Sequence, residues 1–280
     1  MTSISKFSFT ANQFAETNFL LATIAFTLVL LALSIQIYFL LRESHRPDPI
    51  SHYILSISFF LLVFIIIQRS LFIQYFSVTN TFEVLLIFSA IILFILIFYR
   101  LKRQESAEAF IVFGANLLVM ILLALASSPL FPKTILPLIP ALRSSWLVWH
   151  VIMAIIGEAF FAVGFIASIC YLNATENKRK AEIDRLAYIT NTIGFLFYTL
   201  GGIIFGAIWA HYAWGRFWGW DPKETWALIT AVIYAIYLTL RLTNLIRSKI
   251  AAILSITGFL LALFAFFGVN YFLSGLHGYN

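Results

Sequence analysis

Eight long apolar segments dominate the sequence and constrain its fold more than any other feature. Charged residues make up only 11% of the 280 residues, whereas soluble domains carry about 25%. Each segment is long enough for a helix that crosses a bilayer, which needs about 20 apolar residues. The sequence therefore predicts an all-α polytopic integral membrane protein with about eight transmembrane helices. The segments lie at about 19–41, 53–76, 83–100, 109–127, 146–172, 188–210, 222–241 and 249–273.

These segments divide the chain into three parts. Residues 1–18 are polar, and we expect a short external N-terminal segment there. Residues 19–145 hold the first four predicted helices and end in a loop at 128–145, whose four prolines prevent it from being helical throughout. Residues 146–280 hold the last four helices, with a charged loop at 173–187 that we expect to be a solvated cytoplasmic connection.

The distribution of basic residues predicts the orientation in the membrane. Twelve of the 18 Lys and Arg residues lie in the connections that follow the odd-numbered segments. Because basic residues are enriched on the cytoplasmic side, both termini are expected on the periplasmic or lumenal side. That outer side would then carry His150 and His277, while His45 and His52 would lie on the cytoplasmic side.

A tryptophan-rich stretch at Trp214–Trp226, with the sequence WGRFWGWDPKETW, is expected in the same outer region. It contains four of the seven tryptophans, together with Gly215 and Gly219. One interpretation is an interfacial belt of Trp side chains. The other is a flat aromatic platform for a large planar ligand, which the glycines allow to approach the backbone. The four tryptophans are Trp214, Trp218, Trp220 and Trp226.

The second half of this stretch predicts the start of a helix. Asp221 suits the N-cap position, Pro222 the first helical position, and Glu224 the third position of a capping box. Both acidic residues therefore have a structural interpretation beside a functional one.

His150 and His277 are the strongest candidates for metal ligands. Neutral imidazole binds haem iron well, and two histidines on opposite faces of a haem make a bis-His site. The alternative for each is an interfacial His bonded to water or to the backbone. His211 carries the same alternatives, with a hydrogen bond to a haem propionate as a third.

Several polar residues fall inside apolar segments or beside the tryptophans. A carboxylate in the bilayer is costly, so Glu158 is either functional or a neutral group bonded to a neighbouring helix. Arg216 and Lys223 are either partners for ligand carboxylates or solvated charges. The single cysteine, Cys170, excludes an intrachain disulfide and a Cys-x-x-Cys motif. The other polar residues within apolar segments are Asn116, Asn191 and Asn270.

The tryptophan-rich stretch resembles the "WWD" signature of haem-handling membrane proteins, in the form found in the CcsA (ResC) branch of system II cytochrome c biogenesis. The resemblance covers roughly residues 69–280. It extends to Pro140–His150, Gly206–Ala210 and Gly275–Tyr279, and to Asn80 and Glu83, with Phe82 where that family has Tyr.

This resemblance implies a haem-binding subunit of a cytochrome c synthase, a haem lyase, acting with a CcsB (ResB)-like partner. Residues 146–280 would be the haem-handling core. Such a protein presents haem b on its outer face, where the haem vinyl groups join the cysteines of the Cys-x-x-Cys-His motif of apocytochrome c. The membrane would be a bacterial inner membrane or a plastid thylakoid membrane. Because the basic residues are scattered over short connections, the net charge of +6 does not predict a nucleic-acid partner.

By resemblance, His150 and His277 would be the catalytic residues and the axial ligands of the haem iron. By the same resemblance Trp214, Trp218, Trp220 and Asp221 would belong to the haem platform. Arg216 and Trp226 are further candidates for haem binding. Two other interpretations stay open: a haem exporter or chaperone that does not ligate haem, and a transporter or scaffold without haem.

One position departs from the family pattern. The family has a His in the seventh span, in a context like Ile-Tyr-Leu-His-x-Arg, that serves a haem site within the membrane. This chain has Thr239 there, in Ile236–Arg241. Because Thr does not replace an imidazole ligand, the intramembrane site is altered, uses another group such as His211, or is absent from a divergent member.

Overall fold

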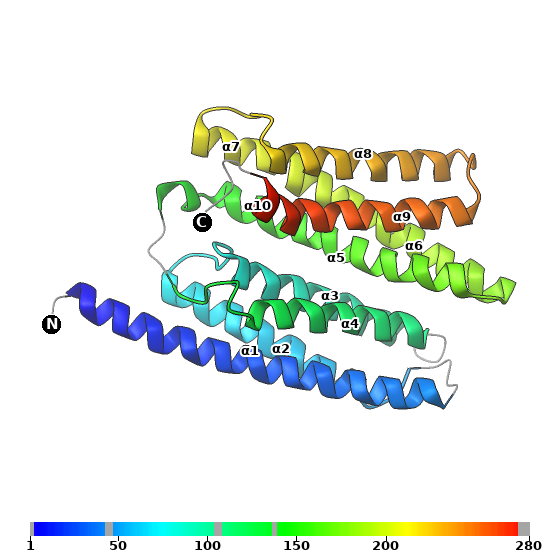
Figure 1. Cartoon of the computed structure of the whole chain (residues 1–280), viewed down its shortest axis with the longest axis horizontal. Coiled ribbons are helices and arrows are strands. Elements are labelled where there is room, and N and C mark those ends of the chain that lie inside the picture. The colour runs from blue at the N-terminus through cyan, green and yellow to red at the C-terminus, as the bar shows by residue number, and fades with distance from the viewer. Residues whose placement is uncertain (1–2, 43–46, 104–107, 136–138, 274–280) are drawn as a thin grey trace. The chain divides into compact units, whose positions relative to one another are not determined.

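The structure is a computed structural model that describes residues 3–42, 47–103, 108–135 and 139–273 (Figure 1). Within these residues the regular secondary structure is all helical, and eight helices are long and apolar enough to cross a membrane. The predicted fold class and number of spans are therefore confirmed. The chain divides into two compact units, Met1–Arg143 and Ser144–Asn280.

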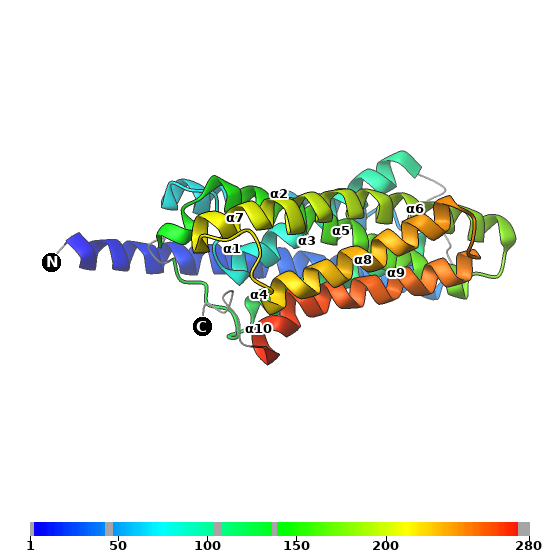
Figure 2. The same cartoon turned by 90° about the horizontal axis from the view of Figure 1, so that it is seen from above.

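Unit 1 is a bundle of four long helices, whose arrangement Figures 1 and 2 show. Each helix packs against the next along the chain, and the fourth packs against the first. The third is the most buried: Phe82, Leu85 and Phe88 are almost inaccessible. The helices are α1 (Ser3–Leu41), α2 (Ser51–Ile73), α3 (Thr81–Arg103) and α4 (Ala109–Ser127).

The first helix is longer than its apolar segment. Within residues 1–18, where we expect a short external segment, α1 begins at Ser3 and its apolar span begins at Ala11. No Gly or Pro occurs before residue 47 to interrupt it. The proline-rich loop behaves as expected, since its described residues hold only one short 3₁₀ turn, Pro140–Leu142.

Unit 2 is built around its first helix, α5 (Ser145–Asn173), which contacts the second and fourth spans of the unit. The second span is one helical run made of α6 (Asn177–Tyr198), a π-helical segment η3 (Thr199–Phe205) and α7 (Gly206–Trp214). The third is α8 (Pro222–Leu242). The fourth is α9 (Ser248–Leu263), a second π-helical segment η4 (Phe264–Gly268) and the short α10 (Val269–Phe272).

The charged connection at 173–187 is mostly helical, which corrects our expectation. Helix α6 begins at Asn177, so only residues 174–176 link it to α5. Lys, Arg, Glu and Ala, which fill residues 178–182, are good helix formers and extend the span beyond its apolar part.

Glycines let α5 approach the α6–η3 run closely. A Cβ on Gly157 would lie 2.5 Å from the backbone nitrogen of Tyr198, and one on Gly201 would lie 2.2 Å from that of Ala154. Both distances are too short for any side chain. Small residues permit such backbone contact between membrane helices, so the most tightly packed helix pair of unit 2 lies beside His150.

Candidate functional site

The tryptophan-rich stretch forms the loop between α7 and α8. Helix α7 ends at Trp214 and is capped by Gly215, whose left-handed φ of 76° suits glycine and whose N–H donates to the His211 carbonyl at 2.9 Å. Helix α8 starts with the predicted capping box. The Lys223 N–H donates to Asp221 Oδ1 at 3.0 Å, and the Asp221 N–H donates to Glu224 Oε2 at 3.2 Å.

Glu224 also fixes the middle of this loop, since the Gly219 N–H donates to its Oε2 at 2.8 Å. The Arg216 guanidinium lies over Gly219, where a Cβ would come within 2.8 Å of Arg216 Nε. Asp221 and Glu224 thus act as caps that shape the loop. Arg216 remains exposed to a ligand or to solvent.

The loop tryptophans do not form one flat surface. Trp218 and Trp220 meet edge to face, with ring planes 87° apart and centroids 5.9 Å apart. Trp226 packs against Phe264 of η4 at 4.5 Å. Trp220 is 71% exposed and has a φ of 56°, which is unfavourable for a bulky residue. Such strain is characteristic of functional loops, and here it accompanies an outward-facing indole.

His150 lies near the start of α5 in a socket made by the neighbouring run. Its Nδ1 is 2.9 Å from the Gly201 carbonyl oxygen in η3. Its ring stacks on that of Trp209, with planes 7° apart and centroids 5.8 Å apart. Trp209 in turn meets Trp214 edge to face at 4.9 Å. The ring of His150 is therefore linked to the loop through two indoles.

This geometry determines which nitrogen of His150 can bind a metal. A carbonyl oxygen only accepts hydrogen bonds, so Nδ1 must carry the proton and donate it to Gly201. The lone pair then resides on Nε2, as in metal-ligating histidines whose second nitrogen donates to a carbonyl. The His150 imidazole is therefore held in the tautomer that binding to a haem iron requires.

The other two histidines of the prediction differ from His150. His277 lies outside the described residues, as does the side chain of Asn270. His211 is exposed and stacks on Phe217 at 4.3 Å. It lies two residues after Trp209, so the two side chains leave α7 about 200° apart. The structure brings Trp209 to His150 and places His211 on the other face of the helix.

The polar residues inside the spans have different surroundings. Glu158 is 7% exposed, and Lys223 interacts with it electrostatically. Asn191 Nδ2 donates to Ser255 Oγ at 2.8 Å, and Asn116 Nδ2 donates to Gln36 Oε1 at 3.2 Å, so both asparagines bond neighbouring helices. Thr239 is exposed on the surface of unit 2.

Our sequence reasoning did not assign Trp209, Gly201 and Gly206 to the site. Gly206 faces His150, because a Cβ there would lie 3.0 Å from the imidazole Cε1 and Nδ1. Gly206 and Trp209 belong to the stretch that resembled the family, but no pattern in it indicates which residue faces α5.

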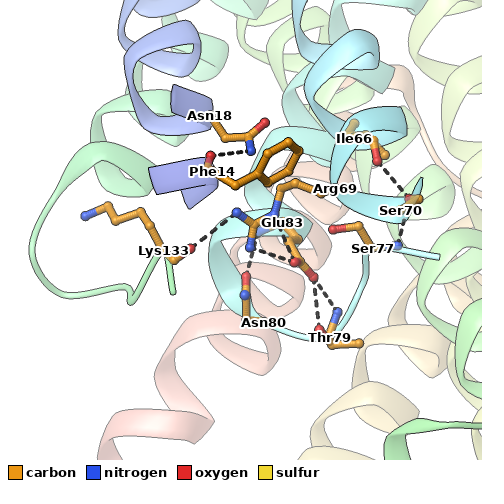
Figure 3. Close-up of polar contacts among 10 residues, drawn as sticks. All are labelled: Phe14, Asn18, Ile66, Arg69, Ser70, Ser77, Thr79, Asn80, Glu83 and Lys133. Carbon is orange, nitrogen blue, oxygen red and sulfur yellow. Dashed lines mark hydrogen bonds and ion pairs between the residues drawn. The ribbon is translucent and has the colours of Figure 1, made fainter. Parts of the chain in front are cut away.

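Unit 1 has a polar cluster of its own, shown in Figure 3. The fully buried Arg69 donates to Glu83 Oε1 from Nε at 3.0 Å and from Nη2 at 2.8 Å. Its Nη1 donates to the Lys133 carbonyl at 3.2 Å. The Thr79 N–H donates to Glu83 Oε2 at 2.8 Å, and the Glu83 N–H donates to Asn80 Oδ1 at 2.9 Å. The charged groups of Arg69 and Glu83 are both bonded within the protein, so this cluster holds the ends of α2 and α3 and the proline-rich loop together.

Lys133 adds a second anchor for that loop. Its Nζ donates to the carbonyl groups of Ser127 and Ser128 and lies 5.1 Å from the Phe19 ring centroid. Desolvation lowers the pKa of its ammonium group from the ordinary value.

Known proteins resemble this chain along most of its length. The family described as "Cytochrome C assembly protein" matches residues 19–277. The "Cytochrome c biogenesis protein CcsA" of Chlamydomonas reinhardtii is 34% identical over 246 residues, covering 84% of this chain and 69% of that protein. The protein of the same name from Heterosigma akashiwo (strain NIES-293 / 8280G21-1) is 36% identical over 255 residues, covering 74% and 77%.

The fold is also similar to a solved structure, that of a chain titled "Cytochrome c Heme Lyase CcmF". The TM-score is 0.64 at 14% identity, with 90% of this chain and 47% of that chain covered. This chain thus spans about half of that one, and the likeness concerns the fold alone. Together with the match over residues 19–277, these relatives confirm the predicted resemblance: the chain belongs to the cytochrome c assembly family and is an integral membrane protein of the CcsA type.

Proposed function

We propose that this chain is the haem-presenting membrane subunit of a cytochrome c synthase. Its site would be the end of unit 2 that carries the loop between α7 and α8. The observation that supports this most directly is the socket of His150, where the hydrogen bond to Gly201 leaves Nε2 free to bind iron. Handling of haem and apocytochrome c fits a member of the cytochrome c assembly family.

The chain's own residues have three tasks in this proposal. His150 binds the iron from one side, and His277 is the predicted ligand from the other. The exposed ring of Trp220 and the partly exposed rings of Trp214 and Trp218 border the haem, and Arg216 is placed to pair with a carboxylate. Haem b supplies the vinyl groups and the acceptor supplies the thiols, so the protein contributes orientation and proximity.

The surroundings of the site follow from the same proposal. A CcsB-like membrane protein is the proposed partner, and apocytochrome c is the proposed acceptor. The loop end of unit 2 would face the periplasm of a bacterium or the lumen of a thylakoid, as the distribution of Lys and Arg predicts.

Absorption spectra of the purified protein test the ligand assignment. We expect a low-spin haem spectrum in the wild type that is lost in His150→Ala, in His277→Ala and in the double variant. His211→Ala is the matched control, because His211 leaves the opposite face of α7 from Trp209, and it should keep the spectrum. An unchanged spectrum in the double variant would show that the ligands lie elsewhere.

Covalent attachment tests the synthase activity itself. The chain and its CcsB-like partner are co-expressed with an acceptor that carries a Cys-x-x-Cys-His motif. Haem that stays with the acceptor after denaturation supports the synthase. Haem that binds this chain in a His150-dependent manner but never joins the acceptor would instead support a haem chaperone or exporter.

A further inference from the structure

The two closely packed helical runs of unit 2 keep a constant register along most of their contact. The contact residues of α5, taken from its end towards its start, pack one by one against the contact residues of the α6–η3 run, taken from its start towards its end. Each pair is identified by a glycine whose Cβ would clash with its partner, at 2.2 to 2.6 Å. The pairs are Gly164 with Asn191, Phe161 with Gly194, Gly157 with Tyr198, and Ala154 with Gly201.

The register changes at the next pair, which is the one that contains His150. His150 lies four residues before Ala154 and therefore on the same face of α5. Four residues after Gly201 comes Phe205, so a regular α-helix would set a phenyl ring against His150. The structure instead sets Gly206 there, with a Cβ position 3.0 Å from the imidazole.

The π-helical segment η3 causes this change. Across η3 the Gly206 N–H donates to the Gly201 carbonyl, five residues earlier, and also to the Ile203 carbonyl. The bond that spans five residues, and not four, is that of a π-helical turn. One additional residue is thereby fitted into the turn, and the contact face moves from Phe205 to Gly206. The same shift turns Trp209, three residues after Gly206, onto the His150 ring, where Trp209 is 2% exposed.

The Gly201 carbonyl oxygen is close to two hydrogen-bond donors. It has two lone pairs, so it accepts from the Gly206 N–H and from His150 Nδ1 together. It reaches His150 because Gly201 has no side chain, and its backbone therefore packs directly on Met153 and Ala154. The oxygen, the glycine and the indole that contact His150 thus all depend on η3 and on the residues just after it.

We propose that η3 is a positioning device for the His150 ligand. Its additional residue places the Gly201 carbonyl, Gly206 and Trp209 around the imidazole, so that the ring is held with Nδ1 protonated and Nε2 available. This inference rests on the proposed function, since it concerns how strongly His150 binds iron. Hydrogen bonding from the second nitrogen of a ligating His raises its basicity and fixes its plane, and loss of such a bond typically costs about 10- to 100-fold in metal affinity.

Gly206→Ala tests the proposal, with Gly202→Ala as the matched control. A Cβ at 206 would lie 3.0 Å from Cε1 and Nδ1 of His150, whereas one at 202 would lie 3.7 Å from the nearest atom, in the Tyr198 ring. We expect Gly206→Ala to displace the imidazole and lengthen its bond to Gly201. Haem affinity should fall about 10-fold, the haem midpoint potential should rise, and the ferric EPR g values should change. Gly202→Ala should match the wild type in all three.

A second pair of variants tests the stacking partner. Trp209→Phe keeps an aromatic ring beside His150, and Trp209→Leu removes it. We expect the EPR g values, which report the orientation of the axial imidazole, to change little in the first variant and clearly in the second. Thermal unfolding of all variants shows that the measured protein is folded.

The outcomes separate this inference from the proposed function. If the wild type binds haem and His150→Gly loses a low-spin spectrum that added imidazole restores, His150 is a ligand. Wild-type affinity, potential and g values in Gly206→Ala would then overturn the positioning role alone. Equal changes in Gly206→Ala and Gly202→Ala would overturn it as well, because they would report a general sensitivity of η3. A wild type whose bound haem does not depend on His150 would instead overturn the proposed function.

Discussion

The two units contain the same number of membrane-spanning helices but differ in how regular those helices are. The described residues of the four spans in unit 1 form uninterrupted α-helices. In unit 2, two of the four spans contain π-helical segments, η3 and η4. Both segments lie at the end of the unit that carries the tryptophan-rich loop, as the contact of Trp226 with Phe264 shows for η4. Irregular helical geometry thus coincides with the candidate site.

The two units also differ in what their buried polar groups bond. In unit 1, Arg69 and Glu83 are bonded to each other and to the backbone, and Arg100 donates to Ser51 Oγ at 2.8 Å. In unit 2, His150 bonds the Gly201 carbonyl through Nδ1, and in the proposed function its Nε2 binds the haem iron. The buried polar groups of unit 1 named above thus bond within the protein, whereas the proposed function gives one polar group of unit 2, His150, a role in binding.

Removing one partner of the buried ion pair in unit 1 should have the largest effect on stability. Glu83→Ala leaves the guanidinium of Arg69, whose side chain is 0% exposed, without its carboxylate. Loss of one member of a buried pair costs about 3–5 kcal/mol, and we expect a fall of this size in the free energy of unfolding. Unfolding of the detergent-solubilised protein by heat or denaturant provides the measurement.

The double variant Arg69→Met, Glu83→Leu is the control for this prediction. It removes both charges and retains apolar volume, so it should be much closer in stability to the wild type. Haem bound per folded molecule should be unchanged in both variants. A specific loss of haem from folded Glu83→Ala would contradict the division of roles between the units.

Widening the helix contact of unit 2 should have the next largest effect. In Gly157→Ala the new Cβ would meet the Tyr198 backbone nitrogen at 2.5 Å, so α5 and α6 must move apart. Overpacking of this kind costs about 1–3 kcal/mol. Because His150 lies on the same face of α5, haem binding should also weaken. In Gly202→Ala the new Cβ would lie 3.7 Å from the nearest atom, so this variant should keep the wild-type stability and haem binding. A loss of either as large as that in Gly157→Ala would contradict the register described above.

The N-cap of α8 should contribute less than either contact. Asp221→Ala removes the acceptor of the Lys223 N–H and should cost about 1 kcal/mol of unfolding free energy. Asp221→Asn keeps a capping oxygen without the charge, so it should retain stability and haem binding if Asp221 acts only as a cap. Weak haem binding in folded Asp221→Asn would show that the carboxylate itself takes part in the site.

Features set by local sequence could be predicted. The spans follow from their apolar length, and the start of α8 follows from Asp221, Pro222 and Glu224, which lie within four residues of one another. The helical part of 173–187 was missed because we took its charges as a sign of a loop, although these residues favour a helix.

The surroundings of His150 could not be predicted for a different reason. Which residue of the neighbouring run faces His150 depends on the number of residues in the turn that joins α6 to α7. In a regular helix Phe205 would face His150, whereas with the π-helical segment Gly206 faces it. The side chains at 199–205 do not differ in kind from those of an ordinary membrane helix, so the shift is visible only in three dimensions.

The smallest effect is expected at Thr239, the position where the family has a His. Its side chain is exposed on unit 2, while its carbonyl accepts from the Thr243 N–H at 3.0 Å whatever the side chain is. Thr239→Ala should therefore change the free energy of unfolding by less than about 0.5 kcal/mol and leave the haem content unchanged. The measurement is the amount of haem bound per folded molecule in Thr239→Ala, compared with that in His150→Ala. A loss of haem in Thr239→Ala would place a second binding region on the surface of α8, away from the His150 socket, and the irregular end of unit 2 would no longer account for all of the haem.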